Sequence, residues 1–301
     1  MMTVGFAGLG VMGLPMAKKV SGSFDLVVYD IEAARMEGFP KRAGSLAELG
    51  AAVGIAILSL PSSAIVHAAL LGPGGVGQSM DSGGIIVDMS TTEPSVIQEA
   101  AAALERRGVM LLDAPVSGGE QGAKDGTLSI MAGGRQAAFD AVLPVLKTMG
   151  TTIVRMGDSG MGQVAKLVNN LIVGITFAAV SEGFVLGAKS GLSPDLLFQA
   201  IRGGWAGSRV LEVSAPAILN RDFRPGGTVD IHWKDLGYAL AQAKELDVPV
   251  PVTALVHEIF KAARASGRGK LSQPAIIQLW ETLLGIEVRG SASARPSGDS
   301  V

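Results

Sequence analysis

The side chains most capable of chemistry in this sequence are a lysine and an asparagine that share one apolar segment. Residues 163–189 predict a single long helix, and Lys166 and Asn170 stand four positions apart in it, so both project from one face. Burial lowers the pKa of a lysine toward neutrality, which suits proton exchange with a carbonyl or alcohol oxygen. Asn170 would hold the same oxygen or orient the lysine. Spacing alone also allows Lys166 to extend to solvent or to pair with an acid.

A second candidate site follows the predicted strand 109–112. Ser117 and the amides of Gly118 and Gly119 would stand at the carboxyl edge of a sheet, where open α/β sheets bind ligands. A hydroxyl with free amides beside it can bind a small carboxylate. A simple turn that enters a helix explains the same residues equally well.

A third candidate site is the glycine-rich turn near the N-terminus. Gly8, Gly10 and Gly13 stand in the order GxGxxG, directly after a predicted strand and before a predicted helix. In that setting the glycines permit a tight turn, close approach of a pyrophosphate and close helix packing, and the helix N-terminus attracts the phosphates. The predicted cofactor loop comprises Gly8, Leu9, Gly10, Val11, Met12 and Gly13. A glycine-rich turn without a ligand is the simpler alternative.

An acid at the end of the second predicted strand favours the dinucleotide. Asp30 stands where a carboxylate usually binds the ribose hydroxyls of the cofactor. A carboxylate there would repel a 2′-phosphate, and the next residue is Ile31 rather than an arginine that would pair with one. The sequence therefore favours NAD(H) over NADP(H).

The elements that must position these residues change character halfway along the chain. Apolar runs typical of buried parallel strands alternate with helix-like segments in the first half, and only helices are expected after Gly162. The predicted strands are residues 3–7, 26–29, 54–59, 85–89, 109–112, 128–131 and 152–154. The predicted helices are residues 15–20, 62–71, 94–106, 136–148, 163–189, 194–203, 209–219, 232–246, 251–266 and 274–284.

This pattern predicts an α/β protein with a Rossmann-type, doubly wound and mostly parallel sheet, followed by an all-α C-terminal domain joined by a long interdomain helix. The expected domains are residues 1–162, which would bind NAD, and residues 163–290, which would bind substrate and dimerise. Residues 291–301 are expected to form a flexible tail. A helix that is apolar all round must be buried by other helices or by a second subunit, so a homodimer is also expected.

Composition excludes several classes of protein. The 301 residues carry 25 Lys and Arg against 27 Asp and Glu, which does not suit a nucleic-acid-binding protein. There is no cysteine, so disulfides, thiolate metal sites and a cysteine nucleophile are excluded. The histidines are isolated, and no metal site is predicted. No signal peptide is recognised, and the apolar stretch 171–180 is too short to span a bilayer. A cytoplasmic protein that binds no membrane is expected.

Five ordered segments together resemble the β-hydroxyacid dehydrogenase family, which includes 3-hydroxyisobutyrate dehydrogenase and tartronate semialdehyde reductase (2-hydroxy-3-oxopropionate reductase). The segments read GFAGLGVMGLPMA, VDMSTTEPS, DAPVSGGEQGAKDGTLSIMAGG, GQVAKLVNN and WKDLGYAL, and the resemblance extends to about Val288. It implies a Rossmann-type domain and a helical domain that share the long helix, in a dimer or tetramer.

The resemblance also assigns roles to residues of this chain. It implies that Lys166 is the catalytic acid/base with Asn170 as its partner, and that Ser117, Gly118 and Gly119 bind the substrate carboxylate. The expected cofactor-binding residues beyond the loop and Asp30 are Leu60, Pro61, Thr91, Lys234 and Asp235. The implied reaction is reversible hydride transfer between the nicotinamide and the carbonyl carbon of a short 3-oxo acid.

The segment 203–216 is similar to the tartronate semialdehyde reductase branch, with two departures. Trp205 is bulkier than the aliphatic residue expected, and Arg209 replaces a small hydroxyl residue. Arg209 is either an exposed helix residue or a partner for a second anionic group of the substrate. Alternative activities are 3-hydroxyisobutyrate or succinic semialdehyde dehydrogenase, and an imine reductase. A non-catalytic NAD(H)-binding sensor or scaffold is the alternative from another class.

Overall fold

The computed structural model describes residues 3–291 and divides the chain into two compact units, residues 1–168 and 169–301. The predicted boundary after residue 162 coincides with the start of the long helix, whereas the observed boundary falls inside that helix, because its first turns are bonded to the sheet of the first unit. Of the predicted tail, residues 292–301 lie outside the described residues.

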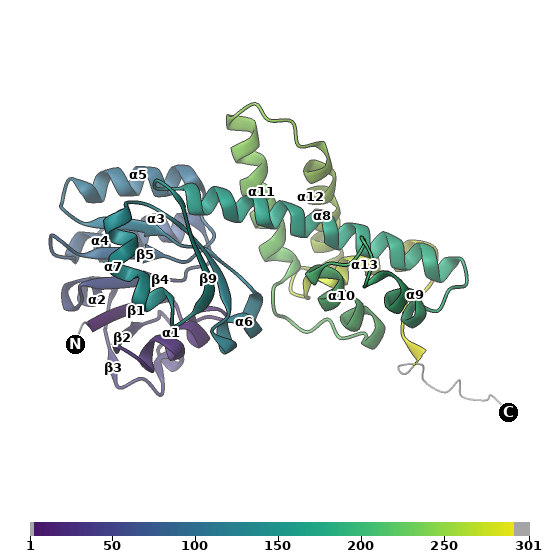
Figure 1. The fold of residues 1–301 in the computed structure, drawn as a ribbon, viewed down its shortest axis with the longest axis horizontal. Helices are drawn as coiled ribbons and strands as arrows, with labels where there is room; N and C mark the ends of the chain where they lie inside the picture. Colours follow the sequence, from purple (N-terminus) through teal and green to yellow (C-terminus); the bar gives the residue numbers. More distant parts are fainter. Residues whose placement is uncertain (1–2, 292–301) are drawn as a thin grey trace. The chain divides into compact units, whose positions relative to one another are not determined.

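A nine-stranded sheet forms the centre of the first unit (Figure 1). Its path runs β3-β2-β1-β4-β5-β6-β8-β7, with β9 paired to β8. All strand pairs are parallel except those that β8 makes with β6 and β7. The strands are β1 (Thr3–Ala7), β2 (Asp25–Tyr29), β3 (Lys41–Arg42), β4 (Ile55–Leu58), β5 (Ile85–Asp88), β6 (Met110–Asp113), β7 (Val116–Ser117), β8 (Leu128–Gly133) and β9 (Gly150–Gly157).

Helices cover both faces of this sheet. One core contains side chains of α1, α6 and α7, and the other contains side chains of α2, α3, α4 and α5. The elements are α1 (Gly13–Ser21), η1 (Ala33–Met36), α2 (Leu46–Ala52), α3 (Ser63–Leu71), α4 (Val76–Ser79), α5 (Pro94–Glu105), α6 (Gly119–Asp125) and α7 (Gln136–Leu146). Within β4, Ile57 enters the first core and Leu58 the second. Such strands must be apolar on both faces, which confirms the predicted doubly wound fold.

The second unit is helical. It comprises the rest of α8 (Met161–Lys189) together with α9 (Pro194–Ile201), α10 (Arg209–Asn220), α11 (Val229–Glu245), α12 (Pro251–Ala263), η2 (Arg264–Arg268), η3 (Gln273–Ile276) and α13 (Ile277–Leu284). One core gathers around Phe184 and Ile218, and another around Phe177 and Phe260. Figure 1 shows α11 and α12 as neighbouring helices joined by a short turn. The predicted all-helical C-terminal region is confirmed.

The long helix α8 is the element on which the candidate site depends. It was predicted from residue 163 and begins two residues earlier, at Met161. By length and composition alone it could cross a membrane, a test that the core helix of a soluble protein also passes. The expectation that no segment spans a membrane was based on residues 171–180 alone, which are only part of this helix. Its buried side chains include polar ones, among them Gln163, Lys166 and Asn170.

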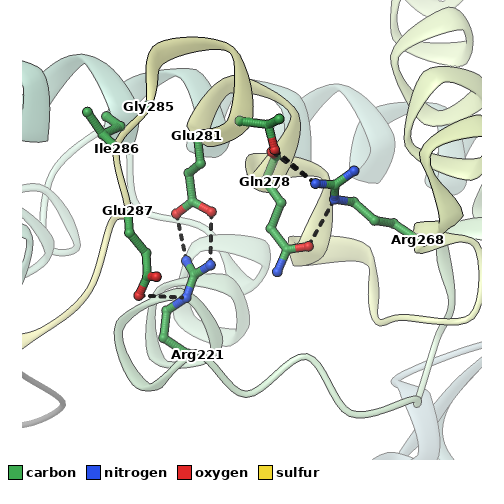
Figure 2. Close-up of a pocket in the computed structure, with 8 residues that line it drawn as sticks. Arg221, Arg268, Gln278, Glu281, Gly285, Ile286 and Glu287 are labelled. Carbon is green, nitrogen blue, oxygen red and sulfur yellow. Dashed lines mark hydrogen bonds and ion pairs between the residues drawn. The ribbon is translucent and has the colours of Figure 1, made fainter. Parts of the chain in front are cut away.

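A buried ion pair anchors the last described segment to the second unit (Figure 2). Arg221 ends α10 in a left-handed conformation, with φ of 56°, and forms two hydrogen bonds of 2.6 and 2.9 Å to Glu281. The Glu281 carboxylate also accepts the Val288 amide at 2.8 Å, and Arg221 donates to the Val288 carbonyl. Arg268 binds Gln278 in the same hollow, which none of the predicted site residues lines. The polar groups of this hollow therefore serve the fold.

We expect Glu281→Gln to lower the free energy of unfolding of this unit by about 2 kcal/mol, because it removes the buried carboxylate that accepts both hydrogen bonds of the partly buried Arg221 guanidinium. Glu287→Gln is the matched control. Glu287 lies 3.6 Å from Arg221 but is half exposed, so its loss should cost less than about 1 kcal/mol. Urea unfolding followed by tryptophan fluorescence reports this unit, because Trp205, Trp233 and Trp280 all belong to it. Equal losses in the two variants would contradict the assignment.

Candidate active site

The glycine loop lies at the carboxyl end of β1, where the strand order of the sheet reverses. Gly8 has a φ of +91°, and a Cβ there would come within 2.2 Å of the Ser59 carbonyl oxygen. A Cβ on Gly13 would come within 1.8 Å of the Gly8 oxygen. At Gly10, by contrast, a Cβ would meet only an Arg35 nitrogen at 4.0 Å. The loop is thus closed on its packed side and open at Gly10, which fits a pyrophosphate approaching the backbone.

Asp30 and Leu60 hold this loop from the two neighbouring strands. The buried Asp30 carboxylate accepts the Leu9 amide at 2.6 Å and the Glu32 amide at 2.8 Å. The Leu60 side chain lies against Gly8, and the Leu60 amide donates to the Ser90 hydroxyl at 2.8 Å. Asp30 therefore shapes the loop, and its remaining lone pairs can accept the ribose hydroxyls proposed from the sequence.

Sequence reasoning missed an arginine beside this carboxylate. Arg35 stands five residues after Asp30, in η1, and its Nη1 lies 3.9 Å from the Asp30 carboxylate. Its other terminal nitrogen donates to Glu32 at 2.7 Å, and its side chain is 42% exposed. Of the residues that follow Asp30, only the one directly after it was considered from the sequence. The turn at η1 brings this more distant cation back beside the Asp30 carboxylate.

Lys166 lies on the buried polar face of α8. It is 9% exposed, so it does not extend to solvent, and Gln163 and Asn170 lie on the same face with exposures of 0% and 5%. These residues follow the spacing i, i+3 and i+7, which keeps them on one side of a helix. The structure thus places a buried amine within a polar stripe, as a proton-transfer residue requires.

The start of α8 is capped by a carboxylate from the sheet. Asp113, the last residue of β6, accepts the amides of Gly160 and Gln163, each at 2.8 Å. Burial raises the pKa of Asp113 from 3.8 to about 6, and the charge of the neighbouring Asp88 adds to the rise, while the two amide bonds oppose it. The helix N-terminus and this carboxylate attract each other, which fixes α8 to the edge of the sheet.

Ser117, Gly118 and Gly119 lie at the junction of β7 and α6. Ser117 is half-buried and pairs with Ser129 across the antiparallel strands, whereas both glycines are exposed. They take positive φ angles of 134° and 64°, and Gly118 is the N-cap of α6. The hydroxyl therefore precedes a helix start with exposed amides. This arrangement is compatible both with a carboxylate site and with a turn that enters a helix.

In the second unit, Asn170 and Asp235 are brought together. The Asn170 amide nitrogen donates to the Asp235 carboxylate at 2.7 Å, and its oxygen accepts from Asn169 at 2.9 Å. Lys234 forms an ion pair with Asp235 at 3.1 Å. Asp235 was expected to bind cofactor. In the structure it orients the amide of Asn170, which keeps a second N–H for a ligand.

Trp205 and Arg209 lie on the surface of the second unit. Trp205 is fully exposed in the loop between α9 and α10, and Arg209 is the exposed first residue of α10. This position fits the interpretation of Arg209 as an exposed helix residue. Thr91 and Pro61 follow β5 and β4, next to Ser90 and Leu60. Among residues 3–291, no cluster of three or more His, Asp and Glu is arranged to bind a metal ion.

Comparison with known proteins identifies the class of this fold and site. Residues 3–157 match the NAD binding domain of 6-phosphogluconate dehydrogenase, and residues 160–280 match the NAD-binding domain of NADP-dependent 3-hydroxyisobutyrate dehydrogenase. The 2-(hydroxymethyl)glutarate dehydrogenase of Eubacterium barkeri is 38% identical over 95% of this chain and 97% of its own. The 2-hydroxy-3-oxopropionate reductase of Escherichia coli is 37% identical over 94% of this chain and 98% of its own.

A solved structure shows the same architecture. The 3-hydroxyisobutyrate dehydrogenase of Mycobacterium tuberculosis, solved with L-serine, superposes with a TM-score of 0.85 at 30% identity, covering 93% of this chain and 99% of that one. The protein is an oxidoreductase that uses a nicotinamide cofactor. The chain belongs to the β-hydroxyacid dehydrogenase family, whose members act on short hydroxy acids.

The raised pKa of Asp113 predicts a specific pH dependence of stability. Between pH 4 and pH 6 the folded chain keeps a proton on Asp113 that the unfolded chain has already released. The stabilisation linked to this group is therefore present below about pH 4 and lost as the pH rises through about 6. Since Asp113→Asn does not titrate, the stability of the wild type relative to this variant should fall by about 2 kcal/mol between pH 4 and pH 7. Urea unfolding followed by circular dichroism measures this difference, and a pH-independent difference would contradict the assignment.

Proposed function

We propose that this protein is an NAD(H)-dependent enzyme that interconverts a short 3-hydroxy acid and its semialdehyde, with Lys166 as general acid/base. The observation that carries the proposal is the burial of Lys166 on a polar face of α8, one turn before the buried Asn170. A non-catalytic NAD(H)-binding protein would not need a buried amine in a helix, because burying a cation is costly.

Each residue has a defined part in the proposed reaction. The loop from Gly8 to Gly13 and Asp30 would hold the dinucleotide, which supplies or accepts the hydride when bound. Ser117 and the amides that follow it anchor the substrate carboxylate. Lys166 donates a proton to the oxygen of the reduced carbonyl and recovers it from the alcohol in the reverse direction. The second N–H of Asn170 holds that oxygen, because Asp235 fixes the orientation of the amide.

The proposed substrate is tartronate semialdehyde (2-hydroxy-3-oxopropionate), which is reduced at its aldehyde carbon. The named relatives support the substrate class. The compounds 2-(hydroxymethyl)glutarate, 3-hydroxyisobutyrate and L-serine each carry a hydroxyl on the carbon β to a carboxylate. The Eubacterium relative is named for a dicarboxylic hydroxy acid, which supports that class of substrate as well. A dicarboxylic 3-hydroxy acid is therefore the second candidate. Methylmalonate semialdehyde, the oxidation product of 3-hydroxyisobutyrate, is an alternative that the Mycobacterium relative supports, and succinic semialdehyde is a further alternative.

The proposed preference for NAD(H) rests on Asp30, which would face a 2′-phosphate with a negative charge. Arg35 opposes this preference because its guanidinium lies beside the same carboxylate. Glu32 binds Arg35 and reduces the positive charge available to a phosphate. The expected result is a preference for NADH that is moderate rather than absolute.

We also propose that the protein is a homodimer or homotetramer in the cytoplasm. The second part of α8 supports the oligomer, since the apolar side chains of Ile172 and Leu186 are 57% and 69% exposed. Fourteen positions separate them, close to four helical turns, so they share one face. A second copy of this face would remove both side chains from water.

Replacing Lys166 with alanine tests the catalytic role. We expect Lys166→Ala to lower kcat by about 100- to 10,000-fold, the usual contribution of a general acid/base, with NADH dissociation constants unchanged within about twofold. Stopped-flow turnover and fluorescence titration of NADH measure the two quantities. Wild-type turnover in this variant would contradict the role. If the wild-type protein binds NADH but turns over no short aldehyde acid, the alternative of a non-catalytic NAD(H)-binding sensor would be favoured.

Two substitutions test the charges that set cofactor preference. Asp30→Ser should reduce the ratio of kcat/KM for NADH to that for NADPH by about tenfold, because it removes the carboxylate that repels the 2′-phosphate. Arg35→Gln should raise the same ratio by a similar factor. Ratios are compared because both variants also affect the loop itself. An unchanged ratio in both variants would show that neither charge contacts the 2′-phosphate.

A further inference from the structure

The first turn of α8 packs against the sheet so closely that a side chain larger than glycine would clash at the contact. A Cβ on Gly162 would come within 2.3 Å of the Met131 oxygen and 2.8 Å of the Asp113 carboxylate. A Cβ on Gly133 would come within 2.6 Å of the same carboxylate. The two glycines therefore permit the direct bonds from Asp113 to the helix start. This end of α8 cannot shift without breaking those bonds.

One side chain of this turn reaches the loop that follows β5. The carboxamide of Gln163 is fully buried, and its nitrogen donates to the Ser90 carbonyl at 2.9 Å. Its oxygen accepts the Thr92 amide, also at 2.9 Å. Gln163 thus binds the backbone on both sides of Thr91, as a paired strand would. Asp88 completes the arrangement by accepting the Ser90 amide at 3.1 Å and the Thr92 hydroxyl at 2.8 Å.

The same helical turn carries Lys166. Gln163 and Lys166 are three residues apart and face the same side of α8, and both are buried. We propose that Gln163 is a positioning residue for the reaction, because it fixes the backbone around Thr91 at a set distance from the amine of Lys166. This inference rests on the proposed function, in which Lys166 moves the proton, and on the resemblance, which implies that Thr91 binds the cofactor.

The chemistry of the contact requires an amide. Ser90 offers an acceptor and Thr92 a donor, so the side chain between them must donate with one atom and accept with the other. A carboxylate would repel the Ser90 oxygen, and an apolar side chain would leave both backbone groups buried without their partner. Misplacement of catalytic groups by about 1 Å is sufficient to slow a reaction about 100-fold.

Kinetic coupling between two positions tests this role. Gln163→Met keeps the length of the side chain and removes both bonds. We expect kcat to fall by about 10- to 100-fold, with substrate KM and NADH dissociation constant unchanged within about threefold. In the Lys166→Ala background the same substitution should lower the residual rate by less than twofold, because the group that it positions is already absent.

Gln163→Glu provides a second variant if the methionine variant is unstable. At neutral pH its carboxylate repels the Ser90 oxygen and the Asp88 carboxylate, which lies 3.5 Å from the Gln163 amide nitrogen, and its protonated form can donate to the Ser90 oxygen again. The kcat of this variant relative to the wild type should therefore rise as the pH falls from 8 to 5. Ser181→Ala is the matched control, since Ser181 is a buried hydroxyl of the same helix that binds only the Phe177 carbonyl at 2.9 Å, and it should leave kcat within twofold.

The outcomes separate this inference from the proposed function. An unchanged kcat in Gln163→Met overturns the positioning role. An equal loss in the wild-type and Lys166→Ala backgrounds also overturns it, because the effect would then be general to the fold. Wild-type turnover in Lys166→Ala would instead overturn the proposed function, whatever Gln163 does.

Discussion

The bond between the Asp113 carboxylate and the first amides of α8 is the contact on which the candidate site depends. It joins the carboxyl end of β6 to the helix that carries Lys166, so the sheet and Lys166 share one direct connection. Ionic capping at a helix N-terminus is favourable because the free amides there carry partial positive charge. In this chain the capping group comes from a distant strand, and its burial makes the connection sensitive to its protonation.

Short polar contacts to backbone amides also hold the rest of the sheet edge. Residues at the carboxyl ends of β1, β2, β4 and β5 bind one another through backbone amides and short polar side chains, rather than through long flexible ones. Asp30 holds the Leu9 amide, and Ser90 holds the Leu60 amide. These bonds fix the glycine loop and the loop around Thr91 before any ligand arrives. Such preorganisation reduces the free energy that binding must spend on ordering the site.

Most of the strands and helices that form this structure can be predicted from the sequence. The strands β1, β2, β4, β5, β6, β8 and β9 were predicted from their continuous apolar runs, which suggest burial on both faces. In β9 this burial is not observed, because the strand pairs only with β8 and most of its residues are partly or fully exposed. The short elements β3, β7, α2, α4 and α6 were not predicted, because two to seven residues carry too little periodicity. The helix α11 begins at Val229, ahead of the predicted residue 232, since Thr228 caps it through its hydroxyl.

The site divides in the same way. The glycine loop and Asp30 follow from spacing within two adjacent elements. The spacing of Lys166 and Asn170 indicates only that they share a helix face, and their expected roles rest on the resemblance to the family. Site roles for Gln163, Asp113 and Arg35 were not predicted from the sequence. Their contacts are with partners that are distant in sequence or that a turn brings close. Gln163 lies 71 residues from Thr92, and nothing in the spacing indicates that contact. Long-range polar contacts of this kind become visible only when the fold is known.

The central claim is that the site transfers hydride between a nicotinamide and a short 3-oxo acid. The most direct measurement is the initial rate of NADH oxidation with tartronate semialdehyde, beside methylmalonate semialdehyde, succinic semialdehyde and an NADPH control. The account predicts rapid oxidation of NADH with tartronate semialdehyde and a slower rate with NADPH. NADH oxidation no faster than the substrate-free control with all three aldehydes, by protein that still binds NADH, would contradict it.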